Sequence, residues 1–323
     1  MSDWTIRPYR VSDMDGITAL VNLVQPHAPY THDRWRWEYP DCAGAGLAWV
    51  AESVGRIISH IGMLGFDWFV DGVQKEAFLH VDAMTHPDFR WRGIHADLTK
   101  VLLEYCHESG APFSYVFPNE KSTKQLVNLD WRQVTRIPRL AIRDLPSALP
   151  PAIKGMEVRK TDRFGDELDG LCEGLRETFR FVLARNHAYL NWRYLDKPDD
   201  DYVPYLALRK GTVEGYMIYK LYEKPGGPKN AHIVDLWTRP DDHDAMAALI
   251  GKTVALAAEG GAAELSCWML PHAPAHPVLL EFGFQPDHED RYLFTHASRG
   301  WAKWDEVTDR ENWYITMGDS DVY

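Results

Sequence analysis

The segment His86-Pro87-Asp88-Phe89-Arg90-Trp91-Arg92-Gly93-Ile94-His95 decides the fold class of this 323-residue chain. Pro87 fixes its own backbone torsion and disfavours helix at the residue before it, so the extended run 76–85 must end here. A helix is expected over 95–109, because apolar residues recur at 3.6-residue spacing, at Ile94, Leu98, Val101, Leu102 and Tyr105. The segment therefore predicts a strand, a tight loop and an amphipathic helix.

The loop between that strand and that helix has the chemistry of an anion site. A helix N-terminus carries roughly half a positive charge and up to about four unpaired N–H donors. Arg90 and Arg92 add two guanidinium groups, and Gly93 lets a ligand approach the backbone. A diphosphate ligand fits this arrangement. The alternative is a pair of solvated loop charges beside an ordinary turn glycine.

The elements around the loop alternate between strand and helix. A strand over 5–10 and a helix over 12–24 come first, followed by a short aromatic helix over 32–39. Strands over 47–52, 57–69 and 76–85 are joined by tight turns, and a strand over 113–117 follows the helix that begins near His95. This order predicts an α/β (α+β) domain with a mixed central sheet flanked by helices.

The arrangement resembles the GNAT superfamily of N-acetyltransferases over most of residues 4–143. The family's pyrophosphate loop reads Arg/Gln-x-x-Gly-x-Gly/Ala, which matches here at Arg90 and Gly93, while His95 takes the place of the last small residue. The resemblance implies an acyl-CoA co-substrate, with acetyl-CoA as the default. It further implies that the CoA contacts are Met84, Thr85, Arg90, Trp91, Arg92, Gly93, Ile94, His95, Ala96, Asn119 and Ser122.

Transfer to an amine needs a base, because an ordinary amine has a pKa about 3 units above neutrality. Period-2 alternation places His80, Asp82 and Met84 on one face of their strand, in a row with Phe78. Asp82 is the first candidate, His80 the second or its partner, and Glu52 the third. The alternatives are a buried polar pair that fixes the strand register and, for Glu52, an exposed edge charge.

Many relatives use a tyrosine as the general acid for the CoA thiolate. Counting back from Trp131, the corresponding position here is Leu126, which cannot donate a proton, and Tyr115 is only a distant substitute. The thiolate, with a pKa near ~8.5, can leave unaided or take a proton from water.

The second half repeats the plan of the first. Trp35-Arg36-Trp37 matches Trp192-Arg193-Tyr194, so that Arg36 and Arg193 lie 157 positions apart. Gly55 and Gly211 lie 156 apart, and Trp131 and Phe284 lie 153 apart. We expect tandem GNAT-like domains: an acyl-CoA-binding catalytic domain over 1–145, a proline-rich linker over 146–154, a degenerate domain over 155–298 and a tail over 299–323.

The second domain is expected to bind no CoA. Its matching loop, residues 238–245, is acidic and has no glycine before its helix. It can still contribute shape to a substrate site, since its aromatic helix resembles the substrate-facing helix of tandem GNAT proteins. The substrate-binding candidates are Trp35, Tyr189, Trp192 and Arg193, and the alternative is a packed aromatic helix.

The amino-acid composition excludes several classes of binding partner for this protein. The formal net charge of -12 argues against nucleic acid and against an anionic membrane surface. No run of about 18 apolar residues and no leader pattern occur, so we expect a soluble cytoplasmic protein. The four cysteines have no CxxC spacing, and prolines surround His272 and His276, so no metal site is expected. The sequence is compatible with a homodimer.

These features favour an enzyme. The predicted reaction is transfer of acetyl from acetyl-CoA to a primary amine of a small metabolite, for example an amino sugar, by direct attack. The alternative, suggested by Leu126 and by the degenerate second copy, is a non-catalytic acyl-CoA-binding or assembly protein on the same scaffold.

Overall fold

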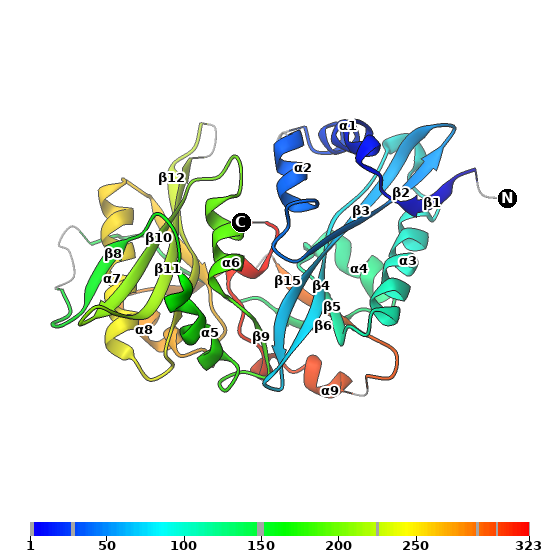
Figure 1. Cartoon of the computed structure of the whole chain (residues 1–323). Coiled ribbons are helices and arrows are strands. Elements are labelled where there is room, and N and C mark those ends of the chain that lie inside the picture. Colours follow the sequence, from blue (N-terminus) through cyan, green and yellow to red (C-terminus); the bar gives the residue numbers. More distant parts are fainter. Residues whose placement is uncertain are drawn as a thin grey trace.

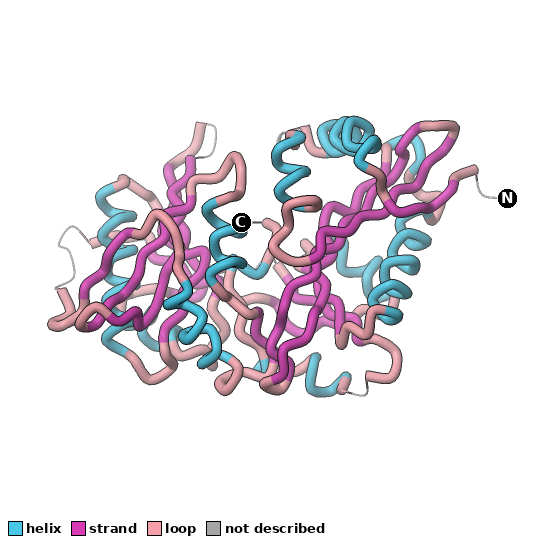
Figure 2. The backbone as a smooth tube through the Cα atoms, in the orientation of Figure 1, coloured by secondary structure: helices cyan, strands magenta, loops and turns pink. Residues whose placement is uncertain are grey.

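The computed structural model describes residues 3–26, 30–146, 152–223, 226–288, 291–301 and 303–322. It shows two mixed sheets, each with helices packed against it (Figure 1; Figure 2), which confirms the expected fold class. Within those residues no helix is long and apolar enough to cross a membrane.

The first half of the chain supplies most of the first sheet. The two-residue turns Val54-Gly55 and Asp71-Gly72 have positive φ at both positions, which suits tight hairpins between antiparallel strands. The elements in order are β1 (Thr5–Pro8), α1 (Met14–Val24), α2 (His32–Glu38), β2 (Ala45–Ser53), β3 (Arg56–Val70), β4 (Val73–Thr85), α3 (Ile94–Glu108), β5 (Phe113–Val116), α4 (Glu120–Val127), β6 (Arg132–Arg136) and β7 (Arg139–Ile142).

The second half follows the same plan around the second sheet. Its elements are β8 (Glu157–Lys160), α5 (Asp169–Leu175), β9 (Phe181–Leu183), α6 (His187–Leu190), a π-helical turn η4 (Asn191–Leu195), β10 (Tyr202–Arg209), β11 (Thr212–Glu223), β12 (Lys229–Thr238), α7 (His243–Glu259), β13 (Glu264–Trp268), α8 (Ala275–Glu281), β14 (Gln285–Asp287), β15 (Tyr292–Ala297), α9 (Trp304–Val307) and a 3₁₀ turn η6 (Met317–Asp319).

The two halves exchange a strand. The first sheet has the order β1-β2-β3-β4-β5-β15-β6, with β9 paired to β3, and the second has the order β14-β7-β13-β12-β11-β10-β8. Strand β7 thus leaves the first half to lie between β13 and β14, and β15 returns to lie between β5 and β6. The division expected near residue 145 therefore separates the halves in sequence but not the sheets. Of the expected linker 146–154, residues 147–151 lie outside the described residues.

Matching turns support the repeat. Val54-Gly55 and Lys210-Gly211 both have positive φ, and so do Asp130 and Gly283, in agreement with the separations of 156 and 153 seen in the sequence. The match between the aromatic helices needs a correction of two residues. The helix N-caps are Thr31 and Asn186, which lie 155 apart, so Trp37 rather than Trp35 is the counterpart of Trp192.

Those two tryptophans join the halves. Their rings are stacked with centroids 4.5 Å apart and an interplanar angle of 9°. The indole N–H of Trp37 donates to the carbonyl of Trp192 at 2.7 Å, and the indole N–H of Trp192 donates to the carbonyl of Trp37 at 3.0 Å. A pair of equivalent residues that exchange equivalent bonds indicates a local pseudo-twofold relation between the two domains.

This contact predicts a graded loss of stability. We expect Trp192→Phe, which keeps stacking but removes the indole donor, to lower the free energy of unfolding by about 1–2 kcal/mol. Trp192→Ala should lower it by about 3–5 kcal/mol, since it also leaves a cavity. Urea unfolding followed by tryptophan fluorescence measures both. The exposed Trp91→Phe is the matched control, and equal effects from Trp91→Phe and Trp192→Phe would contradict the assigned contact.

Candidate active site

A β-bulge in β4 decides which side chains can meet. Between the pairs His60↔Met84 and Gly62↔Val81, strand β3 has one residue and β4 has two, so the register shifts. Asp82 lies in the bulge with φ 50°, and the Nδ1 atom of His60 lies 3.1 Å from its carbonyl oxygen. A bulge interrupts strict alternation, so residues on either side of it need not keep the same face.

The expected shared face of His80 and Asp82 is therefore wrong. The His80 ring packs edge-on against Trp131 at 4.9 Å, on the face of the sheet that α3 covers. Asp82 lies on the other face, where its carboxylate accepts a hydrogen bond from the hydroxyl of Tyr39 at 3.2 Å. Burial, with His296 and His95 nearby, lowers the pKa of His80 to about 3, which makes it a poor base for an amine.

Asp82 belongs to a group of three carboxyl side chains from distant parts of the chain. Glu38 at the end of α2 and Asp321 near the C-terminus are its neighbours, and burial together with these two carboxylates raises the pKa of Asp82 well above its usual range. Burial and Glu38 likewise raise the pKa of Asp321. The hydroxyl of Tyr30 donates to Glu38 at 2.7 Å, and the Nε atom of Arg34 lies 3.6 Å from the same carboxylate.

Two of these carboxyl groups, Glu38 and Asp321, line a pocket between the two domains. Its apolar wall includes Trp37, Phe66 and Trp192. Its polar wall includes Glu38, the basic residues Arg34, Arg193 and Lys197, and the C-terminal residues Gly318, Asp319, Ser320 and Asp321. Figure 1 shows the C-terminal end of the chain lying between the two halves. The pocket thus combines flat aromatic surface with both acidic and basic groups, which suits a ligand that has an apolar body and charged or polar substituents.

Three of the four predicted substrate residues line this pocket, and Trp35 does not. Tyr189 packs edge-on against Phe66, and Trp192 forms part of the wall. Arg193 holds the C-terminal segment, since its Nη2 atom donates to the carbonyl of Ser320 at 2.8 Å. Trp35 is 1% exposed and packs against Tyr9 and Tyr39 in the core.

Glu52 and Leu126 lie elsewhere. Glu52 pairs with Arg7 at 2.7 Å, and Arg7 also holds Asp13, so Glu52 joins β1 to β2 and is not brought to Asp82. Leu126 is buried beside Trp131 in a small apolar cluster. Sequence reasoning missed Glu38, Trp37 and Asp321. Glu38 alone had a local signal, namely an acid four residues after Arg34 at the end of an aromatic helix.

The loop before α3 is open to a ligand. Gly93 has φ 85°, and a Cβ atom placed on it would meet nothing within 4 Å. It is the N-cap of α3 and makes no side-chain cap hydrogen bond, so the first turn keeps N–H groups for an anion. Arg90 donates to the carbonyl of Thr85 at 3.2 Å, and Arg92 donates to the carbonyl of Asp88 at 3.1 Å. Both guanidinium groups are thereby held beside the loop.

The helix behind the loop is fixed to the sheet. Ile94, Leu98 and Leu102 are buried with Phe78 in one apolar cluster, so the first turn has a rigid base. His95 and Ala96 in that turn are half-buried, and burial lowers the pKa of His95. The exposed Trp91 stands on the outside of the loop with φ 66°.

Strands β4 and β5 separate just before the bulge. They are paired in parallel only at Phe78↔Ser114 and Leu79↔Tyr115, whereas β4 continues to Thr85. Met84 and Thr85 lie on one side of this separation, and Asn119, which follows β5, accepts a bond from the Ser122 hydroxyl on the other. The separation lies on the part of β4 that carries the bulge at Asp82.

The corresponding loop of the second half differs. At α7 the side chain of Asp242 accepts a hydrogen bond from the backbone N–H of Ala245, so the helix is capped by its own carboxylate. Arg209 pairs with Asp242 at 2.6 Å. Among the described residues, no group of three or more His, Cys, Asp or Glu side chains is arranged to hold a metal ion.

Comparison with known proteins agrees with this geometry. A family model described as an acetyltransferase (GNAT) domain matches residues 5–131, and no curated protein sequence matches the chain. A GCN5-related N-acetyltransferase from Anabaena variabilis is similar in fold, with a TM-score of 0.69, 13% identity and coverage of 91% of this chain and 72% of that one. A tandem GNAT protein from the clavulanic acid biosynthesis pathway is similar in fold, with a TM-score of 0.61 and 14% identity. The match covers 91% of this chain and 98% of that one. Saccharomyces cerevisiae N-myristoyltransferase with bound myristoyl-CoA is similar with a TM-score of 0.61 and 12% identity, and the match covers 92% of this chain and 84% of that one.

The matched residues contain the α3 loop, the bulged strand and the opening between β4 and β5, which are the parts that an acyl-CoA donor requires. The second sheet repeats the plan of the first and shares strands with it. Residues 5–131 therefore match an acetyltransferase (GNAT) domain, and the chain, with its second sheet of the same plan, has the fold of a tandem GNAT protein.

Proposed function

We propose that this protein transfers an acetyl group from acetyl-CoA to the primary amine of a small cationic metabolite, such as an amino sugar. The observation that carries the proposal is the position of Asp82. Asp82 lies on the bulge of β4, and its carboxylate neighbours Glu38 and Asp321, which line the interdomain pocket. The amine and the thioester would meet at this point.

The donor side rests on the α3 loop. The N–H groups of the first turn of α3, together with Arg90 and Arg92, would hold the pyrophosphate, and the edge of β4 at Met84 and Thr85 would run beside the pantetheine arm. Asn119 and Ser122 would border the same arm from the other side. The relative from Saccharomyces cerevisiae binds a long acyl-CoA, whereas acetyl is the donor group proposed for this chain.

The acceptor side rests on the carboxyl group. A primary amine arrives protonated, and deprotonating an ordinary amine at pH 7 costs about 4–5 kcal/mol. Asp82, whose pKa is raised by burial, Glu38 and Asp321, takes that proton more readily than an ordinary aspartate. The nitrogen then attacks the thioester carbonyl carbon, the N–C bond forms and the C–S bond breaks, and the second proton of the nitrogen passes to water or to the departing thiolate. The CoA thiolate leaves without a protein acid, since Leu126 occupies the usual tyrosine position.

Loss of CoA binding is the first test. We expect Gly93→Glu to raise the Kd for CoA by about a hundredfold or more, through clash and charge repulsion at the diphosphate site. The matched control is Gly110→Glu at the other end of α3, which has φ 79° and equally open surroundings. Isothermal titration calorimetry measures both. A Kd that changes equally in the two variants would remove the diphosphate site from the proposal.

Loss of turnover is the second test. Thiol release from acetyl-CoA with a panel of amines measures the activity, and Asp82→Asn should lower kcat/KM by about 10²–10⁴-fold, as expected for loss of a general base. Glu52→Gln, which removes a carboxylate that lies outside the pocket, should leave it within about twofold. If the unaltered protein binds acetyl-CoA but releases no thiol with any amine, the non-catalytic alternative is the better account.

The pH dependence is the third test. The base must be ionised, so a raised pKa of Asp82 means that kcat/KM falls as pH decreases through values well above the ordinary aspartate pKa. Glu38→Gln removes a neighbouring negative charge, so it should lower the pKa of Asp82 and move this acid limb to lower pH by about one unit. An acid limb that stays in place or moves upward would show that Asp82 and Glu38 are not coupled.

A further inference from the structure

The second domain has its own counterpart of Asp82. In the first domain Tyr39, just after α2, donates to Asp82 at 3.2 Å. In the second, Tyr194 lies 155 positions later and donates to Asp235 at 3.0 Å. Asp235 also lies on the strand equivalent to β4, beside a register shift between β11 and β12. The two carboxylates thus occupy equivalent positions in the duplicated fold.

Their surroundings differ in charge. Asp235 is 1% exposed, and the Nε atom of Arg185 lies 3.3 and 3.2 Å from its two oxygens. It also accepts hydrogen bonds from Tyr216 at 2.9 Å and from the hydroxyl of Thr316 at 3.0 Å. A buried carboxylate with a guanidinium partner and this many donors is fully satisfied, so Asp235 has no free capacity for a substrate.

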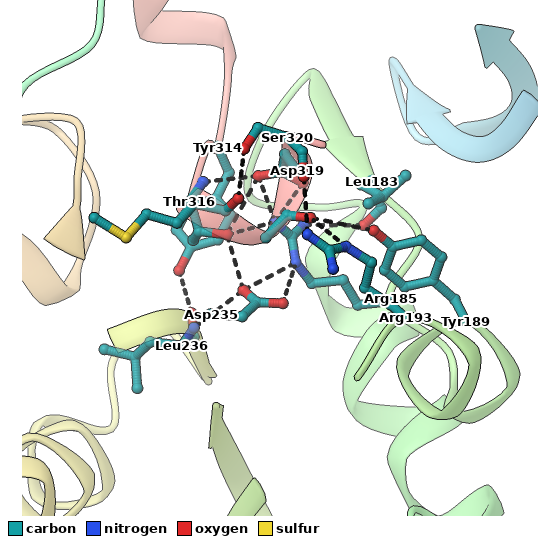
Figure 3. Close-up of polar contacts among 12 residues, drawn as sticks. Leu183, Arg185, Tyr189, Arg193, Asp235, Leu236, Tyr314, Thr316, Asp319 and Ser320 are labelled. Carbon is teal, nitrogen blue, oxygen red and sulfur yellow. Dashed lines mark hydrogen bonds and ion pairs between the residues drawn. The ribbon is translucent and has the colours of Figure 1, made fainter. Parts of the chain in front are cut away.

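Arg185 joins that position to the C-terminal segment, as Figure 3 shows. Its Nη2 atom lies 2.7 Å from each oxygen of Asp319, and the backbone N–H of Thr316 donates to Asp319 at 2.7 Å. Arg185 and Asp319 are both buried. The segment 314–320 therefore fills the place in the second domain where a substrate would otherwise meet Asp235.

From this anchor the chain continues into the acceptor pocket. Gly318 passes so close to Tyr194 that a Cβ atom on it would lie 2.0 Å from the phenol oxygen. Arg193 donates to the carbonyls of Gly318 at 3.3 Å and Ser320 at 2.8 Å. The next residue, Asp321, is the third carboxyl beside Glu38 and Asp82.

The position of Asp321 beside the carboxyl groups of Glu38 and Asp82 is opposed by electrostatic repulsion. The groups that face Asp82 are Glu38 and Arg34 from α2, Tyr39 after α2, Tyr30 before it, His60 from β3 and Asp321 from the C-terminal segment. Arg34 is a permanent cation in this set and Arg193 is a second one near Asp321, against three carboxyl groups. The buried network around Arg185 must therefore hold the segment in place, and an ammonium group in the pocket would reduce the repulsion.

We propose that the second domain serves as a docking site for the chain's own C-terminal segment, with Arg185 as the positioning residue. Through Asp319 it holds Gly318–Asp321 as one wall of the acceptor pocket, and it thereby presents Asp321 to the ammonium group of the amine. The specificity part of this proposal rests on the proposed function, whereas the docking part does not.

The kinetic experiment uses the full chain and three variants. Asp319→Asn weakens the anchor, Asp321→Asn removes only the presented charge, and a chain ending at Ser320 removes the last residues while keeping the anchor. In each we expect the KM for the amine to rise about tenfold or more, with the Kd for CoA unchanged within about twofold. Asp305→Asn, at an exposed acid of α9, is the matched control and should change neither value.

Two further measurements distinguish the loss of the Asp321 charge from a general loss of structure in the C-terminal segment. Asp321→Asn should move the acid limb of kcat/KM to lower pH, because it removes a negative neighbour of Asp82. Hydrogen exchange of the backbone amides of 316–320 should become faster in Asp319→Asn than in the unaltered protein. An unchanged amine KM in Asp321→Asn would overturn the role of Asp321. Unchanged exchange in Asp319→Asn would overturn the docking role, even if no amine supports turnover.

Discussion

The exchange of β7 and β15 between the two sheets is the constraint on which the rest of the structure depends. Each sheet obtains one of its inner strands from the other half of the chain, and neither strand can be withdrawn without exposing the N–H and C=O groups of two neighbours. The paired indole rings of Trp37 and Trp192 and the pairing of β9 with β3 add to this link. The interdomain pocket therefore has walls that are fixed relative to each other, which a site assembled from two domains requires.

The bulge in β4 places His80 and Asp82, two titratable residues of one strand, on opposite faces of the sheet. On the α3 face, His80 is buried against Trp131 near the first turn of α3. On the other face, Asp82 meets Glu38 and Asp321 beside the pocket. One extra residue in the strand is enough to turn the carboxylate toward the acceptor side while the strand edge continues toward the α3 loop. In the proposed function, the donor and the acceptor would approach the same point from opposite faces of the sheet.

The two copies of the fold differ in the charged groups around their equivalent aspartates rather than in the arrangement of their strands and helices. Asp82 and Asp235 occupy equivalent positions and each accepts a bond from an equivalent tyrosine, but Asp235 has Arg185 as a partner and Asp82 has carboxylates as neighbours. Burial and the neighbouring carboxylates raise the pKa of Asp82, which makes it a stronger base than an ordinary aspartate. The same contrast appears at the helix N-termini, where α3 begins at an open glycine and α7 at the carboxylate of Asp242.

The sequence by itself determined the features that short-range interactions encode: the loop 86–95, the tight turns at Val54-Gly55 and Lys210-Gly211, and the repeat that links them. These follow from backbone torsions and apolar spacing within a few residues. The tertiary structure alone decided the strand exchange, the face on which Asp82 lies and the meeting of Glu38, Asp82 and Asp321. Alternation along β4 placed His80 and Asp82 together because no local residue pattern signals the bulge. Residues as far apart as Glu38 and Asp321 share one pocket only because the C-terminal segment is anchored to the second domain, and a pKa shift caused by burial and by neighbouring charges exists only once that packing is complete.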